Sequence, residues 1–349
     1  MNILLIAHPY LNLYKTIQNE LTNEGHKVTF ISDIKLSHDP HIKTLPLIIR
    51  ILNYLIWYIN KPCTKRWQSI YNNTNIFKTK YDLLFVIQGC SFDKKILDFL
   101  RKNNPNIKSV LYIWDSNKYY NFFRNSPYFD KVYSVDLEDV QRAQKDNIKF
   151  LPFFWPKSIE SDDKQNIKYK ISSIGTNHHN RYQIYKRVSK DLEYKNVPYF
   201  IKLIIKQKEK TTIIDRIRLF FYKLLNKKNN IDDLKLKTGK LKENFIQNYP
   251  IEIDEFCQIM LSSEAILDTD SNLQYATTPR LIWALAANKH IFTTNENIKN
   301  FPFYNEEYIH IISRHNPIID LNLINTNGIK PSKSVENLRI DKWLKNFLE

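Results

Sequence analysis

Residues 264–295, EAILDTDSNLQYATTPRLIWALAANKHIFTTN, decide how this chain folds. The apolar run that ends at Asp268 predicts a strand, and the turn-forming residues after it predict a loop. Thr278 and Pro279 predict the start of a helix, because threonine caps helix N-termini and proline is favoured at the first helical position. Residues 290–294 (HIFTT) predict the next strand. A strand, a helix and a second strand in this order form a unit of a parallel α/β sheet.

The loop before Pro279 has the character of an anion-binding site. A helix N-terminus presents N–H groups and the positive end of the helix dipole to a ligand. Arg280 lies in the first turn, where the dipole disfavours a cation, and an anion held by its guanidinium would explain it. The alternative is an ordinary strand–helix–strand unit with a surface arginine.

The N-terminal half of the chain predicts a parallel sheet of its own. No glycine occurs before Gly25, so the first strand is not followed by a dinucleotide-binding fingerprint or a P-loop. Functional groups of parallel sheets gather beyond the carboxyl ends of the strands. By this criterion His8, Gly89, Asp115 and Asp136 are candidates. The predicted strands are residues 2–7, 27–31, 81–89, 109–115, 131–136 and 149–155.

A second α/β series begins after the polar residues 156–165, which predict a linker. Its first strand, residues 169–175, ends at Gly175, where the backbone can approach a ligand closely. The helix that follows has Arg181 near its N-terminus and forms a second candidate anion site. Two such series predict two domains, with the boundary between Pro156 and Lys168 and a cleft between them.

The chain resembles GT-B glycosyltransferases, in particular those of capsule and lipopolysaccharide loci. The resemblance rests on ILD at 266–268, TPRLIWAL at 278–285, Lys289, FTTN at 292–295, Ile298 and FY at 303–304, with LYIWDS at 111–116 and LP at 151–152 in the first half. It implies two Rossmann-like domains that face each other across a cleft. Residues 1–156 would form the acceptor domain and residues 157–334 the nucleotide-sugar domain, and a helix in 335–349 would cross back to the first domain.

The resemblance also implies the chemistry and the residues that perform it. The expected function is transfer of a hexosyl or related group from a nucleotide sugar to a growing cell-surface polysaccharide or polyprenyl-linked acceptor, as in capsule, O-antigen or lipopolysaccharide synthesis. No cofactor or metal is expected, because GT-B enzymes stabilise the leaving diphosphate with helix N-termini and basic side chains. The acceptor hydroxyl needs a base, for which Asp115 is favoured over Asp136 and His8, although a carboxylate at a strand end is equally explained as a helix cap. The expected donor-binding residues are Gly175, Thr176, Arg181, Tyr275, Thr277, Thr278 and Arg280.

Two departures from the family pattern keep other functions open. Many GT-B enzymes carry two glutamates eight positions apart, and Tyr275 and Trp283 stand in their places here. This favours, as the alternative, a noncatalytic GT-B-like partner of a polysaccharide-synthesis enzyme. A nucleic-acid-binding protein is a third hypothesis that rests on the net charge of +16 alone, because the chain has no helix-turn-helix signal, zinc-ligand spacing or RNP motif. The adjacent His178 and His179 do not form a metal motif by themselves.

Charge and hydropathy point to a membrane surface as a partner. Residues 200–245 hold 13 Lys or Arg against 5 Asp or Glu, beside an apolar helical face. Residues 45–77 interleave apolar, aromatic and basic residues. Residues 200–245 are either a solvated charged helix or a contact with an anionic membrane or an acceptor lipid. Residues 45–77 are either a pair of core helices or a segment that lies on a membrane surface. No apolar run reaches the ~20 residues that span a bilayer, the N-terminus is not that of a signal peptide, and Cys63, Cys90 and Cys257 are expected to be free thiols. The expected location is the cytoplasm, with peripheral association at the inner face of the membrane.

Overall fold

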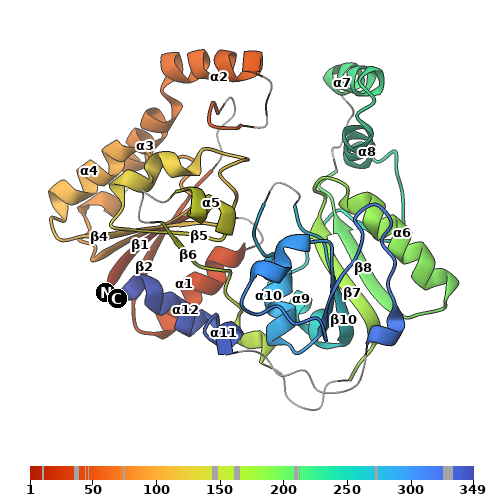
Figure 1. The fold of residues 1–349 in the computed structure, drawn as a ribbon. Helices are drawn as coiled ribbons and strands as arrows, with labels where there is room; N and C mark the ends of the chain where they lie inside the picture. The colour runs from red at the N-terminus through yellow and green to blue at the C-terminus, as the bar shows by residue number, and fades with distance from the viewer. Residues whose placement is uncertain are drawn as a thin grey trace. The chain divides into compact units, whose positions relative to one another are not determined.

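The chain folds into two compact units, each built on one parallel six-stranded sheet. The computed structural model describes residues 1–9, 12–34, 39–43, 45, 47–73, 75–143, 148–160, 166–207, 211, 213–271, 274–324 and 333–349. The first unit comprises Met1–Pro156, Leu273–Thr277 and Asn337–Glu349, and the second comprises Lys157–Asn272 and Thr278–Glu336. The predicted α/β class is therefore confirmed (Figure 1). Residues 161–165 of the predicted linker lie outside the described residues.

The sheet of the first unit has the strand order β2-β1-β3-β4-β5-β6, and every pair of neighbours is parallel. Its strands are β1 Asn2–Ala7, β2 Lys27–Ser32, β3 Leu83–Ile87, β4 Lys108–Ile113, β5 Lys131–Ser134 and β6 Ile148–Phe150. Its helices are α1 Leu13–Asn23, α2 Leu47–Asn60, α3 Pro62–Asn73, α4 Lys94–Asn103, α5 Leu137–Arg142 and α12 Ile340–Leu348, with the 3-10 helices η2 Asn75–Lys78 and η3 Phe122–Tyr128. The last strand is shorter than the predicted 149–155, because the chain beyond Phe150 leaves the sheet.

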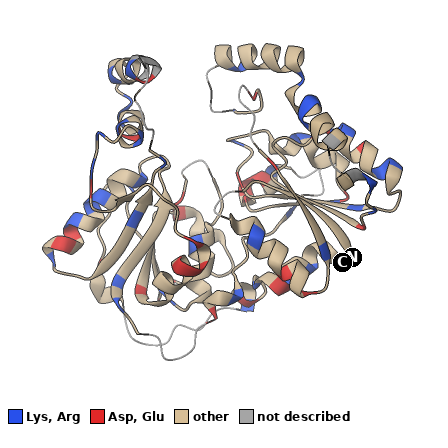
Figure 2. Ribbon diagram, turned by 180° about the vertical axis from the view of Figure 1, so that it is seen from behind, with Lys and Arg blue, Asp and Glu red and all other residues tan. Residues whose placement is uncertain are grey.

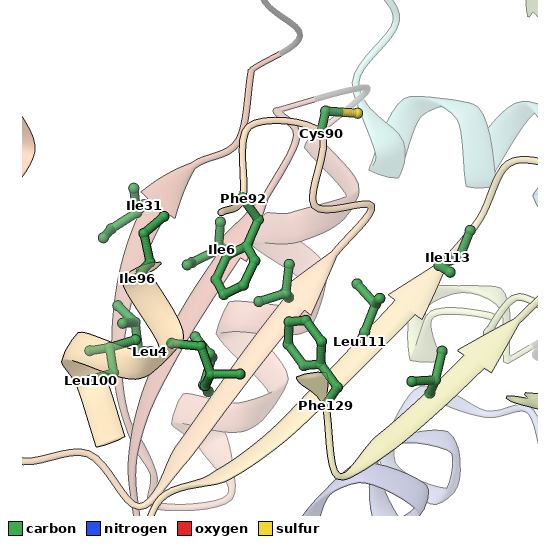
Figure 3. Close-up of a cluster of buried hydrophobic side chains, with 14 of the residues drawn as sticks. Leu4, Ile6, Ile31, Cys90, Phe92, Ile96, Leu100, Leu111, Ile113 and Phe129 are labelled. Atoms are coloured by element: carbon green, nitrogen blue, oxygen red, sulfur yellow. The ribbon is translucent and has the colours of Figure 1, made fainter. Parts of the chain in front are cut away.

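Side chains alternate between the two faces of this sheet, as the strand period requires. One face carries aliphatic residues such as Leu4, Leu111 and Ile113, which belong to one buried cluster with Phe92 and with Ile96 of α4 (Figure 3). The opposite face carries aromatic residues that α12 covers, and the Phe347 ring stacks on Phe85 with centroids 4.6 Å apart. Both faces are therefore buried, and the strands expose functional groups at their ends.

The C-terminal segment is not the single helix that residues 335–349 predict. A short helix, α11 Lys333–Glu336, belongs to the second unit, and α12 belongs to the first. Between them the backbone pairs with Trp155, whose N–H donates to Leu338 O and whose carbonyl accepts from Ile340 N, both at 3.0 Å. These two bonds replace helical ones and break the helix.

The sheet of the second unit has the order β12-β11-β10-β7-β8-β9 and is also parallel throughout. Its strands are β7 Tyr169–Thr176, β8 Tyr199–Ile204, β9 Ile246–Gln247, β10 Ser263–Asp268, β11 His290–Thr293 and β12 Ile309–Ile311. Its other helices are α6 Arg181–Tyr194, α7 Ile213–Leu224, α8 Lys228–Lys237, α9 Ile253–Leu261 and α10 Pro279–Ala286, with the 3-10 helices η4 Lys157–Ile159, η5 Glu296–Asn300 and η6 Leu321–Leu323. The strand–helix–strand unit predicted from residues 264–295 is thus β10, α10 and β11, and its start at Thr278 and Pro279 is confirmed.

The prediction of a core helix pair in residues 45–77 is wrong for the first helix and right for the second. In α3, Cys63 and Trp67 are buried, and the Trp67 indole N–H donates to Ser91 O at 2.6 Å. In α2 the one buried side chain is that of Asn53. Most of its apolar side chains are exposed, which is not the case in a core helix.

Candidate functional site

The candidate site of the second unit lies where the strand order reverses. From β7 the chain runs through α6 to β8 on one side, and it later returns to place β10 on the other side of β7. In parallel α/β sheets, ligands bind beyond the carboxyl ends of the strands at such a switch point. The residues that leave β7 and β10 there are Gly175–Thr176 and Asp268–Thr269–Asp270. The sequence analysis predicted Gly175 and Thr176 as donor-binding residues. In the loop after β10 it predicted the start of α10, at Thr278 and Arg280, and not the residues at the strand end.

Asp268 is the centre of this site. Its side chain is fully buried and accepts hydrogen bonds from Thr278 Oγ1 at 2.6 Å and from Thr293 Oγ1 at 2.9 Å. The Arg280 guanidinium supplies the opposite charge, with Nη1 3.5 Å from Asp268 Oδ1. A buried carboxylate is tolerated when its charge and its lone pairs are matched in this way. Both threonines of the TTN motif at 293–295 thus hold a carboxylate of this site, because Thr294 Oγ1 donates to Asp270 Oδ1 at 2.6 Å as Thr293 does to Asp268.

Three arginines from three different elements hold the last residue of β10 and the two residues that follow it. Arg280, from α10, faces Asp268, as described above. Arg181, from α6, donates to Thr269 through Nε, at 2.6 Å from Oγ1, and through Nη2, at 2.5 Å from the carbonyl oxygen. Arg314, beyond β12, pairs with Asp270 through Nη2. The sequence analysis selected Arg181 and Arg280 but missed Arg314 and Asp270, because no local pattern connects residues that far apart in the chain.

The site carries an excess of positive charge. Three guanidinium groups converge on a loop that supplies two carboxylates. The same excess acts on His179, whose ring reaches solvent and whose Nε2 lies 2.9 Å from Ser271 Oγ. The protein atoms around that ring, and then the positive charges of Arg314 and Arg181, lower the pKa of His179. An anionic ligand would compensate the excess at these strand ends.

Arg280 has a different environment from the one its sequence position predicts. Its side chain is only 7% exposed, and its Nε donates to Ile174 O at 3.1 Å. The anion that explains a cation in the first turn is thus already present in Asp268. The first turn also offers fewer N–H groups than expected, because Pro279 has none and Leu281 N donates to Thr278 Oγ1 at 3.1 Å. Within the described contacts, the Arg280 backbone N–H and its Nη2 remain open to a ligand.

Gly175 is required by crowding at the same place. A β-carbon there would lie 3.0 Å from Arg181 Nη1 and 3.3 Å from Arg280 Nη2. With a side chain at this position, these guanidinium groups would have to give way by a few tenths of an ångström. The glycine therefore lets the end of β7 approach both arginines, whereas close approach to a ligand remains a prediction. Thr176, next in the chain, accepts a hydrogen bond from Arg181 Nη1 through its carbonyl oxygen.

The strand ends of the first unit hold Asp115 between two amides. Gln88 Nε2 donates to Asp115 Oδ2, and Gln274 Nε2 donates to Oδ1 at 2.8 Å. Gln274 comes from residues 274–277, the part of the β10–α10 loop that belongs to the first unit. Asp115 is half-buried, and His8 is also half-buried at the end of β1. Asp115 is therefore fixed in orientation yet accessible to solvent.

Asp136, a predicted base, is placed as a helix cap. It is buried, and its Oδ1 accepts from Asp139 N at 3.0 Å while its Oδ2 accepts from Tyr275 N at 3.0 Å. Leu137 N donates back to Tyr275 O at 3.0 Å. With both oxygens occupied by backbone N–H groups, Asp136 anchors a loop and caps α5. Its assignment as a base is not retained.

The predicted donor-binding residues divide between the two units. Gly175, Thr176, Arg181, Thr278 and Arg280 meet at the switch point of the second unit. Tyr275 and Thr277 belong to the first unit, where the Thr277 hydroxyl is buried and has no hydrogen-bond partner among the described residues.

Asp33 is a further residue that the sequence analysis missed. It is fully buried at the end of β2 and accepts from Cys90 N at 2.6 Å and Ser91 N at 2.7 Å. Gln88 and Gly89, just before them, both have φ of 70°, in the left-handed region. Asp33 therefore holds the strained loop that carries Gln88, and with it the partner of Asp115.

Trp283, at one of the two positions where the resemblance expects a glutamate, is a core residue. It is buried, and its ring lies 5.4 Å from that of Phe256 in α9. An indole in this place cannot accept a hydrogen bond from a ribose hydroxyl. Among the described residues, no group of His, Cys, Asp or Glu is arranged to hold a metal ion.

Comparison with known proteins identifies the fold. No family model matches the chain, and no curated protein matches it. Among solved structures, the α,α-trehalose-phosphate synthase (UDP-forming) from Burkholderia vietnamiensis is similar with a TM-score of 0.56 at 10% identity, over 100% of this chain and 98% of that one. The E. coli trehalose-6-phosphate structure bound with UDP-2-fluoro glucose gives 0.54 at 11% identity, over 100% and 98%. The synthase from Burkholderia xenovorans gives 0.53 at 11% identity, over 99% and 97%. These similarities extend over both units, and the chain therefore has the α/β fold of the GT-B glycosyltransferases.

Proposed function

We propose that this protein is a glycosyltransferase that moves a sugar from a nucleotide-sugar donor to a growing cell-surface polysaccharide or lipid-linked acceptor, of the capsule, O-antigen or lipopolysaccharide type. The observation that carries the proposal is the convergence of Arg181, Arg280 and Arg314 on the strand ends of β7 and β10 in a GT-B fold. A nucleotide diphosphate is the anion that such a site would hold. One structure with the same fold was determined with a UDP-sugar analogue bound.

In this proposal the basic groups stabilise the leaving group. The bond between the anomeric carbon and the diphosphate oxygen breaks, and negative charge develops on that oxygen. The Arg280 Nη2 and backbone N–H would donate to the diphosphate. Arg181 and Arg314 would act indirectly, since their guanidinium groups hold Thr269 and Asp270 and add positive charge to the site. The glycine at 175 would let the diphosphate approach the backbone.

Asp115 is the proposed base for the acceptor hydroxyl. The acceptor oxygen forms the new bond to the anomeric carbon, and its proton would pass to the Asp115 carboxylate. The amides of Gln88 and Gln274 orient the carboxylate without giving it a proton. His8, at the end of β1, is the other candidate.

Calorimetric titration with UDP, GDP, ADP and CMP, followed by their sugar conjugates, tests the proposal. The cognate nucleotide is expected to bind and to raise the thermal unfolding temperature, because a ligand at 100 times its Kd adds ~2.7 kcal/mol of stability. Tight binding of a sugar conjugate together with release of the nucleotide in the presence of acceptor would support transfer. Absence of binding by every nucleotide and conjugate would overturn it.

The alternative function is that of a noncatalytic partner of a polysaccharide-synthesis enzyme. The core position of Trp283 favours it, since the usual ribose contact is missing. The same titration separates the two functions. A noncatalytic partner would bind no nucleotide sugar, or would bind it without releasing nucleotide when acceptor and donor are both supplied.

The inner membrane surface is the proposed location, with the basic region 200–245 as one contact. In α7 and the residue after it, Phe220, Phe221, Leu224 and Leu225 are exposed next to exposed lysines, among them Lys223. No helix among the described residues is long and apolar enough to cross a membrane. Binding to anionic vesicles that falls as salt rises would support this contact, because screening weakens attraction between exposed charges. Equal sedimentation with neutral and anionic vesicles at low salt would contradict it.

A further inference from the structure

Helix α2 presents its apolar side chains to the outside of the first unit. Along its length Leu47, Ile48, Ile51, Leu52, Tyr54, Leu55, Tyr58 and Ile59 are all more than half exposed. Ile48 reaches 81%. At 3.6 residues per turn these side chains cover one broad side of the helix. Figure 1 shows α2 above α3 and away from the sheet.

The side of α2 that faces the protein is the more polar one. Asn53 is the buried residue of the helix, and Arg50, Ile56 and Trp57 are half-buried on the same side, about one turn before and after it. The Trp57 ring contacts His41 with centroids 5.6 Å apart. A surface helix normally turns its apolar side inward and its polar side to water. In α2 the one buried side chain is polar and the outward side is apolar, so the outward side needs an apolar environment of its own.

The charge around α2 indicates which apolar environment it is. Between Asp39 and Asp82 the sequence contains no acidic residue and seven Lys or Arg. Of these, Lys61 and Lys65 are exposed directly after α2 and in α3. Figure 2 shows α2 almost free of charged residues, with basic residues on the adjoining α3. Apolar side chains flanked by cations match a bilayer with anionic headgroups, whereas pairing with a second copy would bring these cations together.

We propose that α2 is a membrane-insertion element that lies in the plane of an anionic bilayer surface, with its outward aliphatic side chains below the headgroups. The helix of 14 residues is about 21 Å long, too short to span the hydrocarbon core and long enough to lie along its surface. Tyr54 and Tyr58 would sit at the headgroup level, where tyrosine is favoured. Lys61 and Lys65 would contact lipid phosphates.

This inference deepens the membrane contact of the proposed function but can fail separately from it. The contact assigned to residues 200–245 is electrostatic and is lost at high salt. Insertion of α2 is driven mainly by apolar burial, which salt does not weaken. The proposed nucleotide site includes neither α2 nor α7. A protein that binds vesicles but no nucleotide would therefore refute the proposed transferase function and leave α2 as a membrane element.

The first experiment is flotation with phosphatidylcholine vesicles that contain phosphatidylglycerol, at low and at high salt. The full chain is expected to float in both. The variant Ile48→Ser/Leu52→Ser/Leu55→Ser is expected to partition roughly 100-fold more weakly, about fivefold for each half-inserted aliphatic side chain. Exposed side chains tolerate serine, so its circular dichroism and thermal unfolding should match those of the parent. The matched control is Ile167→Ser/Ile318→Ser/Leu323→Ser, three exposed aliphatic residues of the second unit, which should float like the parent.

The second experiment measures insertion directly. The three native cysteines are buried and free, so a new cysteine at position 55 can be labelled selectively with a polarity-sensitive dye. Labelled Leu55→Cys should shift its emission to the blue when vesicles are added. Labelled Tyr194→Cys, on exposed α6, should not shift.

Three results would overturn the inference. One is equal flotation of the parent and the α2 triple variant at high salt, and another is an unshifted dye at position 55 on vesicles that carry the protein. The third is a dimer of the parent, without vesicles, that the triple variant converts to a monomer. That result would assign the α2 surface to a second copy of the chain.

Discussion

Replacing Arg280 by alanine is expected to destabilise the second unit by about 3–4 kcal/mol. The mutation leaves the fully buried Asp268 carboxylate without its charge partner, a loss worth ~3–5 kcal/mol in buried pairs. The lower end of this range applies, because Thr278 and Thr293 still donate hydrogen bonds to the Asp268 carboxylate. The lost bond from Nε to Ile174 O adds about 1 kcal/mol. An exposed arginine at a helix end, as the sequence alone predicts, would cost almost nothing.

A double-mutant cycle tests this estimate. Urea unfolding would be followed by fluorescence and circular dichroism for Arg280→Ala, Asp268→Asn and the double variant. The two changes should be non-additive by about 1–3 kcal/mol, because asparagine removes the charge that Arg280 compensates. Arg187→Ala, an exposed arginine of α6, is the control and should change stability by less than about 0.5 kcal/mol. Additive effects at positions 268 and 280 would refute the pairing.

Three further outcomes follow from the described contacts. Burial lowers the pKa of Lys289 from 10.5 to about 8, so the folded state binds fewer protons than the unfolded state between these two pH values. The free energy of unfolding should therefore rise with pH across this window by up to about 3 kcal/mol. Urea titrations at several pH values should show this rise in the parent protein and not in Lys289→Met. Asp115→Asn should lower the rate of sugar transfer by about 10²–10⁴ while leaving nucleotide affinity unchanged, and an unchanged rate would remove Asp115 as the base. Thr278→Val should cost about 2 kcal/mol in thermal or urea unfolding, since it removes both the cap of α10 and a donor to Asp268, whereas Thr278→Ser should stay within about 1 kcal/mol of the parent.

The fold followed from periodicity and capping residues, which are local signals. The strand before Asp268, the Thr278 cap and the proline at the first helical position each depend on a few adjacent residues. The same signals do not report where a face of a helix points. Residues 47–60 have the apolar content of a core helix, and only the structure shows that Asn53 faces inward while Ile48 faces outward.

Residues of the candidate site could be named from the sequence, but the contacts between them could not. Arg280 was selected as a cation in the first turn of a capped helix, and Gly175 as a position of close backbone approach before a helix N-terminus. That Arg280 pairs with Asp268, or that Arg314 reaches Asp270 across 44 residues, depends on the strand order β12-β11-β10, which no local pattern fixes. Asp136 shows the same limit, because a carboxylate that caps a helix and one that accepts a proton have identical sequence contexts.

Hydrogen–deuterium exchange with and without a saturating nucleotide diphosphate tests the central claim most directly. The claim is that the donor binds at the switch point between β7 and β10. Exchange should slow in residues 174–181, 268–271 and 278–282, and it should stay unchanged in α2 and α4. Protection confined to other segments, with the nucleotide demonstrably bound, would contradict the placement of the donor site.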